Sequence, residues 1–228
     1  MIPKKHGGAV AAARSESQER LDYPVLLVSG FGAPAFHNDW VAKQLARNGL
    51  DVHKMMLPNM AIGDMRESAK LVSGEVEGIK ALAGSDKVSL VGYSLGGLIA
   101  RIYLQELGGT ESLGRAVFVG APQDGIYTAY LAAWTKAGRQ VCKGSDFMRE
   151  INSGRPCGCD EPRCLAIFLS RDGTILPAAS ARLGCGYNLE LVWPVLHWSL
   201  VFNPGVVRVA TDFLKGGMPE GVVIGVQE

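Results

Sequence analysis

The chain has 228 residues, and its 23 Lys and Arg residues are balanced by 22 Asp and Glu residues, which gives a formal net charge of +1. This balance excludes the strongly basic surface of a nucleic acid-binding protein. The hydrophobic content of 47% is ordinary for a globular protein, and no apolar run approaches the roughly 18 residues needed to span a bilayer. We therefore expect one globular domain without a transmembrane segment.

The N-terminal residues 1–20 differ in composition from the rest of the chain. Lys4 and Lys5 are followed by a short stretch of small residues and then by charged ones, with no long apolar core. This pattern is a poor signal peptide. It predicts a disordered or loosely attached tail before a single domain over residues 21–228, and it favours a cytoplasmic location, with a processed secretory form as the alternative.

Apolar runs alternate with segments of helical periodicity along the first half of the chain. Strands are expected at 24–30, 50–57 and 87–91, and helices at 38–48, 64–83 and 98–107. The continuous apolar run at 24–30 is typical of a strand buried on both faces of a parallel sheet, and Asp64 is a candidate N-cap. The alternation predicts an α/β fold with a mostly parallel sheet of about six strands and helices on both faces.

The alternation stops after a strand expected at 115–120. Ile126, Tyr130 and Trp134 lie one helical turn apart and predict an apolar helix face. We interpret residues 122–160 as a small cap insertion in which Tyr130 and Trp134 bind substrate; an ordinary core helix is the alternative. The sheet is expected to resume at 165–170 and 187–193, before a closing helix at 203–214 that starts with Asn203 as N-cap and Pro204.

The stretch Gly92-Tyr93-Ser94-Leu95-Gly96 matches the Gly-x-Ser-x-Gly nucleophile elbow, and it lies between an expected strand and an expected helix. A serine on so tight a turn is held in a strained backbone conformation. Gly92 and Gly96 are expected because a Cβ at either position would collide with the adjacent strand or helix. Ser94 is therefore the candidate nucleophile; a structural turn with an incidental serine is the alternative.

A serine nucleophile needs a base and an acid, and the chain contains four histidines. His197 follows the last expected strand, so its loop opens at the same edge of the sheet as Ser94. Asp172 follows the strand at 165–170, and the order Ser, Asp, His is that of the α/β-hydrolases. A packed loop histidine and a simple Asp-Gly turn are the alternative interpretations, and Asp124 is the rival acid.

An acyl-transfer site also needs donors for the oxyanion. The backbone N–H groups of Leu95 and Phe31 are the candidates, because one follows the nucleophile and the other follows the first strand. The alternative is that the loop around Phe31 is only a turn. Trp198 lies in the apolar loop beside His197 and is assigned to substrate binding.

Four of the five cysteines gather in one quarter of the chain, at Cys157, Cys159, Cys164 and Cys185. The spacing Cys-x-Cys-x₄-Cys is not that of a standard zinc site. Free thiols, disulfides and a four-cysteine metal site remain open from the residues alone. We expect neither a catalytic metal nor an organic cofactor.

Together these motifs resemble the α/β-hydrolases of the bacterial lipase and esterase type. The matching pieces are Leu26–Gly32, Gly92–Gly97, Val119–Pro122, Asp172–Pro177 and His197. One departure is Ser29, which stands where the family usually has a histidine before the glycine.

The resemblance implies the α/β-hydrolase fold and a serine hydrolase that cleaves a carboxylic ester through an acyl-enzyme on Ser94. The partner it implies is a lipophilic small molecule. Two other functions remain open on the same scaffold. One is an acyltransferase, cyclase or thioesterase of a biosynthetic pathway, and the other is a protein that binds a ligand without hydrolysing it.

Overall fold

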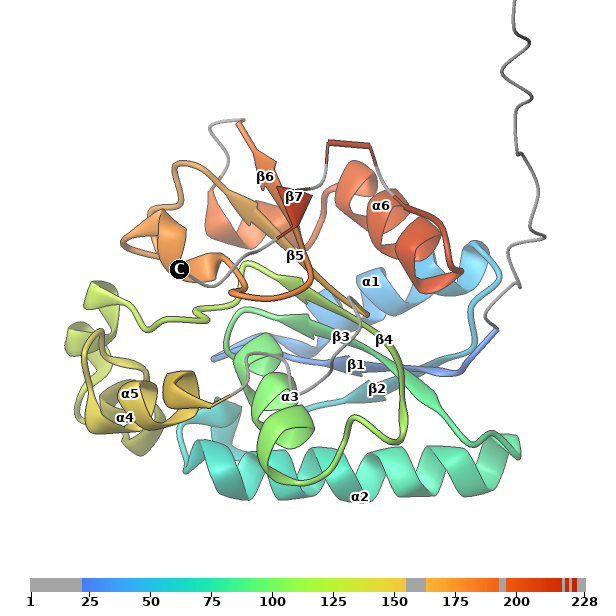
Figure 1. The fold of residues 1–228 in the computed structure, drawn as a ribbon, viewed down its shortest axis with the longest axis horizontal. Helices are drawn as coiled ribbons and strands as arrows, with labels where there is room; N and C mark the ends of the chain where they lie inside the picture. The colour runs from blue at the N-terminus through green and yellow to red at the C-terminus, as the bar shows by residue number, and fades with distance from the viewer. Residues whose placement is uncertain (1–21, 155–162, 193–195, 219, 222, 225–228) are drawn as a thin grey trace, which may run out of the picture.

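The computed structural model describes residues 22–154, 163–192, 196–218, 220–221 and 223–224. Its strands form one sheet in the order β2-β1-β3-β4-β5-β6-β7 (Figure 1). All neighbouring strands are parallel except β7, which is antiparallel to β6. The strands are β1 Val25–Val28, β2 Val52–Met55, β3 Val88–Tyr93, β4 Leu113–Val119, β5 Cys164–Leu169, β6 Tyr187–Leu191 and β7 Val223–Ile224.

Helices cover both faces of the sheet. The α-helices are α1 Ala35–Arg47, α2 Met65–Ala83, α3 Leu95–Glu106, α4 Lys136–Val141, α5 Asp146–Ser153 and α6 Pro204–Leu214. Short 3₁₀ helices are η1 Pro58–Ala61, η2 Tyr127–Ala132, η3 Ala178–Ala181 and η4 His197–Leu200. One apolar core lies between the sheet and α2 and α3, and a second lies between the sheet and α1 and α6 (Figure 1).

The central strands are buried on both sides, as the continuous apolar runs predict. In β1, Leu26 and Val28 belong to the core beneath α2 and α3, whereas Val25 and Leu27 belong to the core beneath α1 and α6. The predicted mostly parallel α/β sheet with helices on both faces is therefore confirmed.

Two helix starts agree with the predicted caps. The Asp64 carboxylate accepts hydrogen bonds from the backbone N–H groups of Arg66 and Glu67 in the first turn of α2. The Asn203 side chain does the same for Gly205 and Val206, with Pro204 in the first helical position. These side chains satisfy N–H groups that have no partner inside the helix.

Some boundaries differ from the expectation. Helix α1 begins at Ala35, three residues before the predicted start. The prediction missed this first turn because it is exposed and adds nothing to the apolar stripe from which the helix was predicted. Strand β6 ends at Leu191, and the predicted extension to Trp193 reaches residues outside the described part. The two-residue strand β7 is too short to produce a recognisable pattern.

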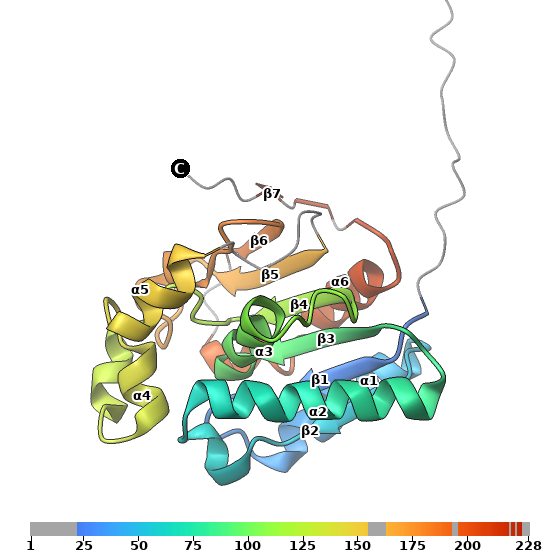
Figure 2. The ribbon, with the colours of Figure 1, turned by 60° about the horizontal axis from the view of Figure 1, so that its bottom comes forward.

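The segment between β4 and β5 forms η2, α4 and α5, which lie beyond the carboxyl ends of the strands (Figure 2). The predicted helix with Ile126, Tyr130 and Trp134 on one face is wrong, since η2 is a 3₁₀ helix and α4 starts only after Thr135. A 3₁₀ helix turns once every three residues, so positions four apart no longer align. Residues 155–160 of the predicted insertion and the predicted tail lie outside the described residues.

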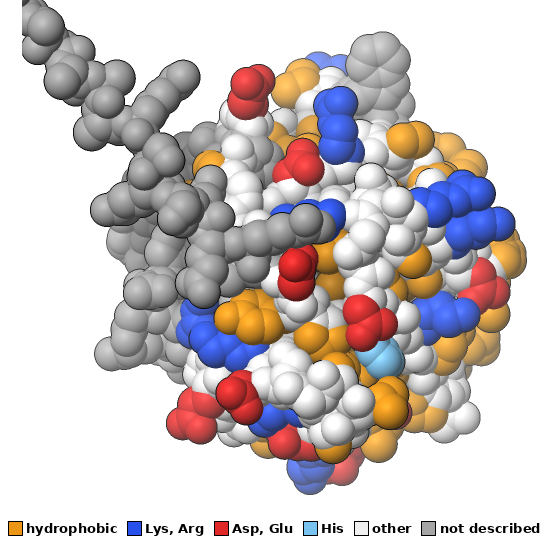
Figure 3. Space-filling model, turned by 90° about the vertical axis from the view of Figure 1, so that its right-hand side faces the viewer, with side chains coloured by type: hydrophobic (Ala, Val, Ile, Leu, Met, Phe, Trp, Pro, Cys, Tyr) orange, Lys and Arg blue, Asp and Glu red, His pale blue; other side chains and the backbone are white. Residues whose placement is uncertain are grey.

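The described surface in Figure 3 carries Lys and Arg side chains interspersed with Asp and Glu, without a large area of one sign. None of the described helices is long and apolar enough to cross a membrane.

Candidate active site

Ser94 lies on the sharp turn between β3 and α3, with φ 51° and ψ −128°. Positive φ is costly for a residue with a Cβ, and such strain is concentrated at functional sites. A Cβ on Gly92 would lie 2.4 Å from the Gly97 Cα atom, and one on Gly96 would lie 2.3 Å from the Ser29 carbonyl oxygen. The predicted need for glycine on both sides of Ser94 is therefore confirmed.

The three predicted triad residues meet at the carboxyl edge of the sheet. The His197 Nε2 atom lies 3.0 Å from Ser94 Oγ, and its Nδ1 atom lies 2.7 Å from Asp172 Oδ2. A carboxylate can only accept, so Nδ1–H donates to Asp172 and leaves Nε2 to accept from the Ser94 hydroxyl. This arrangement can take a proton from Ser94 and hold the charge that develops on the imidazole.

Asp172 is 2% exposed, and its second oxygen is also paired. Oδ1 accepts from the backbone N–H groups of Thr174 at 2.8 Å and Ile175 at 3.0 Å. Burial alone raises the pKa of this carboxyl group, but the hydrogen bond and charge of His197 together with the two backbone hydrogen bonds outweigh it and lower the pKa below its ordinary value. Asp172 is therefore held as a carboxylate.

The rival acid, Asp124, lies elsewhere. Its side chain is 60% exposed and forms an ion pair with Lys143. Its other oxygen accepts a hydrogen bond from Asn152 Nδ2 at 3.1 Å. Asp172, and not Asp124, contacts the His197 ring.

Phe31 and Leu95, the residues whose amides were predicted as oxyanion donors, line the same cavity as Ser94. Within the described part of the chain, neither amide donates a hydrogen bond to another group. The loop that carries Phe31 is held by the Ser29 hydroxyl, which accepts from Leu57 N at 3.3 Å, and by Gly32 N, which donates to Met60 O at 3.0 Å. Ser29 thus ties this loop to the segment after β2.

Two cavities flank Ser94. The cavity under η2 and α4, here called the η2–α4 cavity, has a volume of about 200 Å³, and the cavity beside η4, here called the η4 cavity, has about 140 Å³. Both are lined by Phe31 and Ser94. The η2–α4 cavity is further lined by Leu95, Pro122, Ile126, Thr128, Ala129, Ala132, Gly138, Val141 and Thr174. The η4 cavity is further lined by Gly30, Gly32, Ala33, Pro34, His37, Tyr93, Val119, His197, Trp198, Leu200 and Val201.

Of the three predicted substrate-binding residues, one lines a cavity at Ser94 and two do not. Trp198 lines the η4 cavity beside His197. Of the described residues, Tyr130 and Trp134 line neither cavity and are 60% and 75% exposed. The Tyr130 hydroxyl donates to the carbonyl of Lys143 at 3.2 Å.

Sequence reasoning missed most residues that line the η2–α4 cavity, because they are small and follow no simple period. One local signal could have located α4. Thr135 is an N-cap whose hydroxyl accepts from Gly138 N at 2.9 Å, and threonine is a preferred N-cap residue. With α4 placed, Gly138 and Val141 could have been assigned to its inner side.

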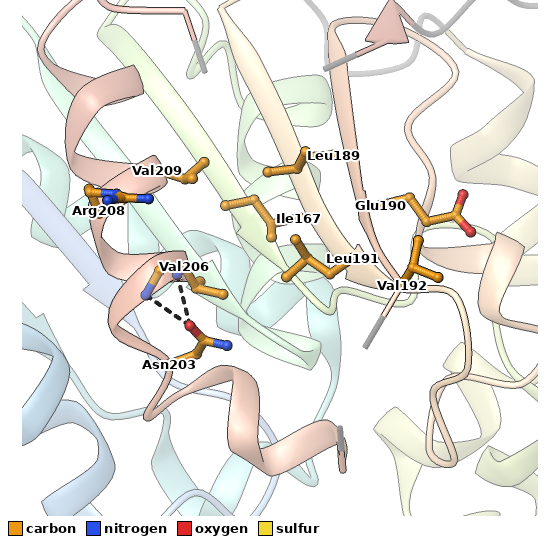
Figure 4. A pocket seen from close by; sticks show the side chains of 10 residues that line it. Ile167, Leu189, Glu190, Leu191, Val192, Asn203, Val206, Arg208 and Val209 are labelled. Atoms are coloured by element: carbon orange, nitrogen blue, oxygen red, sulfur yellow. Dashed lines mark hydrogen bonds between the residues drawn. The ribbon is translucent and has the colours of Figure 1, made fainter. Parts of the chain in front are cut away.

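A larger cavity of about 530 Å³, here called the β6–α6 groove, lies away from this site (Figure 4). Ile167 and Leu189 from the sheet face Val206 and Val209 from α6 across it. Within the described part of the chain, none of the triad residues lines this groove. Size alone therefore does not mark the reactive site.

None of the described cysteines belongs to the hydrogen-bonded chain of Ser94, His197 and Asp172. Cys185 is disulfide-bonded, Cys142 is a buried thiol, and Cys157 and Cys159 fall outside the described residues. No group of three or more His, Cys, Asp or Glu side chains suited to a metal ion occurs among the described residues.

The fold and the arrangement of the Ser, His and Asp side chains are those of an α/β-hydrolase. Similar solved structures include lipase B of Aspergillus fumigatus, with TM-score 0.75 and 20% identity over 91% of this chain and 54% of that one. They also include the propeptide form of lipase BlEst2 of Bacillus licheniformis, with TM-score 0.68 and 18% identity over 95% and 53%. A third is the lin2722 gene product of Listeria innocua, with TM-score 0.64 and 17% identity over 90% and 98%.

The chain spans about half the length of the two lipases. No curated protein matches the sequence. The model of the palmitoyl protein thioesterase family matches residues 24–158, which is more than half of the chain. The protein therefore belongs to the palmitoyl protein thioesterase family, within the lipase-, esterase- and thioesterase-like α/β-hydrolases.

Proposed function

We propose that the protein is a serine hydrolase that cleaves an acyl ester or thioester of a lipophilic substrate. The observation that carries this proposal is the hydrogen-bonded chain from Ser94 through His197 to Asp172. The match to a thioesterase family supports a thioester as a substrate. An ester remains an equal candidate, because hydrolysis of either substrate passes through the same acyl-enzyme.

The reaction begins when Ser94 Oγ attacks the carbonyl carbon and its proton passes to His197 Nε2. The negative charge on the carbonyl oxygen is held by the N–H group of Phe31, from the loop after β1, and by that of Leu95 at the N-terminus of α3, where the helix dipole also favours it. His197 then gives the proton to the leaving oxygen or sulfur as the bond to the acyl carbon breaks. Water attacks the acyl-enzyme, again through His197, and releases a carboxylic acid.

The direct test is hydrolysis of p-nitrophenyl butyrate and of butyryl-coenzyme A by the wild type, Ser94→Ala and Ser153→Ala. Ser153 is a matched control, because its exposed hydroxyl donates to the Glu150 carbonyl at the end of α5 and lines neither cavity at Ser94 among the described residues. The wild type and Ser153→Ala should cleave both substrates, and Ser94→Ala should lose activity by several orders of magnitude. Activity that survives in folded Ser94→Ala would refute the proposal.

A further inference from the structure

Ser94 lines two cavities, which differ in the other groups of the site that they reach. Among the described residues, His197 lines the η4 cavity and not the η2–α4 cavity, whereas Leu95 lines only the latter. His197 Nε2 must deliver a proton to the leaving atom, so the leaving group has to lie on its side. The acyl group then occupies the η2–α4 cavity.

The walls of the η2–α4 cavity are apolar. Ile126 and Val141 are almost fully buried aliphatic residues that lie side by side, since Ile126 N donates to the Val141 carbonyl, and no charged side chain occurs among the described residues that line the cavity. The Thr128 hydroxyl is already used, since it donates to the Thr174 carbonyl at 2.5 Å. Walls of this kind favour a hydrocarbon chain over a polar acyl group.

The volume of the η2–α4 cavity limits the chain that it can enclose. An apolar cavity of about 150 Å³ holds one benzene molecule with its six carbon atoms. At about 200 Å³, the η2–α4 cavity has room for roughly eight carbon atoms on the same scale. The palmitoyl chain in the family's name is about twice as long.

The 3₁₀ helix η2, which lines the cavity, is held in place by the loop that carries Asp172. Tyr127 N donates to the Leu176 carbonyl at 2.7 Å, next to the bond between Thr128 and Thr174. The loop itself is held by the hydrogen bonds that its backbone donates to the buried Asp172. Lifting η2 would break these contacts.

Helix α4, which also lines the cavity, is held in place as well. Ala137 N donates to the Ile62 carbonyl at 3.2 Å, and Gln140 Oε1 accepts from Met65 N at 2.9 Å. A Cβ on Gly138 would lie 2.0 Å from the Ala132 carbonyl oxygen, so η2 and α4 are already in backbone contact. Enlarging the part of the cavity under η2 and α4 would therefore require several hydrogen bonds to break.

We propose that the protein is selective for short to medium acyl chains of about four to eight carbons, and that Ala132 and Val141 set this limit. The inference rests on the proposed function, because it assigns the acyl half of the same site. The acyl chain proposed here is shorter than the palmitoyl group in the name of the family.

The test is kcat/KM for p-nitrophenyl esters from acetate to palmitate, each below its critical micelle concentration. We expect kcat/KM to rise about fourfold for each methylene that enters the cavity, up to roughly eight carbons, and not beyond. A value that keeps rising to palmitate would overturn the inference and leave the proposed function intact. No hydrolysis of any ester or of butyryl-coenzyme A would instead overturn the proposed function.

Variants of the walls should move the limit in opposite directions. Ala132→Phe fills the cavity from a partly exposed position, so it should lower kcat/KM for octanoate at least tenfold relative to butyrate. Val141→Ala removes two methyl groups and should extend the rise by one or two carbons. Val209→Ala is the matched control, because it makes the same change in the β6–α6 groove and should leave the profile unchanged.

Each outcome decides the inference. If Ala132→Phe does not fold, Val141→Ala alone still tests the wall, since a valine-to-alanine change removes little volume. If Val141→Ala keeps the wild-type profile, or if Val209→Ala shifts the profile equally, the η2–α4 cavity does not hold the acyl chain.

Discussion

The η2–α4 cavity and the β6–α6 groove both contain aliphatic wall residues, but they differ in the other groups that line them. The groove is larger, at about 530 Å³ against about 200 Å³. The smaller cavity is lined by Ser94, Phe31 and Leu95. The groove lies between β6 and α6 with none of these groups on the described part of its wall. Polar groups that converge on Ser94, and not volume, therefore distinguish the candidate active site.

The largest expected effect on activity distinguishes the two acids that the sequence offered as partners of His197. Asp172→Asn should lower kcat about 10⁴-fold, because an amide at this position no longer holds the imidazole tautomer in which Nδ1 carries the proton. Asp124→Asn is the control, since Asp124 pairs with Lys143 away from His197. Steady-state kinetics on p-nitrophenyl butyrate measures both variants, and similar losses in the two would contradict the assignment.

A smaller effect concerns the packing beneath Ser94. Gly96→Ala places a Cβ 2.3 Å from the Ser29 carbonyl oxygen, so it should destabilise the fold by several kcal/mol and lower activity. Gly74→Ala lies within α2 with no atom within 4 Å of its new Cβ. It should stabilise the protein by about 0.5–1 kcal/mol. Urea unfolding of the two variants compares them, and equal free energies of unfolding would refute the close packing of the elbow.

The titration of Asp172 gives a further contrast between the site and the rest of the molecule. Its pKa in the folded protein lies below the ordinary value of 3.8. Its contribution to stability is therefore fully present above pH 3.8 and is lost as the pH falls through the lower, folded pKa. The difference in free energy of unfolding between the wild type and Asp172→Asn should therefore shrink as the pH falls below 3.8. A difference that grows as the pH falls below 3.8 would contradict this direction.

The smallest effect belongs to the β6–α6 groove. Val209→Phe fills part of this groove, far from the triad, so kcat/KM for p-nitrophenyl butyrate should stay within about twofold of the wild-type value. Ala132→Phe makes the comparable addition in the η2–α4 cavity. A large loss of activity in folded Val209→Phe would mean that the groove takes part in substrate binding, and the comparison between the two cavities would fail.

The sequence predicts those parts of the molecule whose local patterns have direct structural consequences. The buried strands appear as continuous apolar runs, and the turn at Ser94 requires the glycines that flank it. Asp172 and His197 could be brought to the same edge because the carboxyl ends of parallel strands meet there. These features depend on short stretches of sequence and on one rule of topology.

The segment over the η2–α4 cavity could not be predicted in the same way. Its 3₁₀ helix breaks the period on which the predicted helix face of Tyr130 and Trp134 depended, and its packing rests on backbone contacts such as Gly138 against Ala132. Side chains as small as Ala129 and Ala132 leave no apolar stripe to recognise. The size of a cavity arises from the tertiary packing of such residues, which a single sequence does not encode in a readable pattern.

The most direct test of the central claim is covalent labelling with a fluorophosphonate, followed by intact mass and peptide mapping. Such reagents phosphonylate a serine that a neighbouring base has activated. We expect one adduct per chain, on the peptide that contains Ser94, and none on Ser94→Ala. An adduct on a different serine, or equal labelling of the wild type and Ser94→Ala, would contradict the account of Ser94 as the nucleophile.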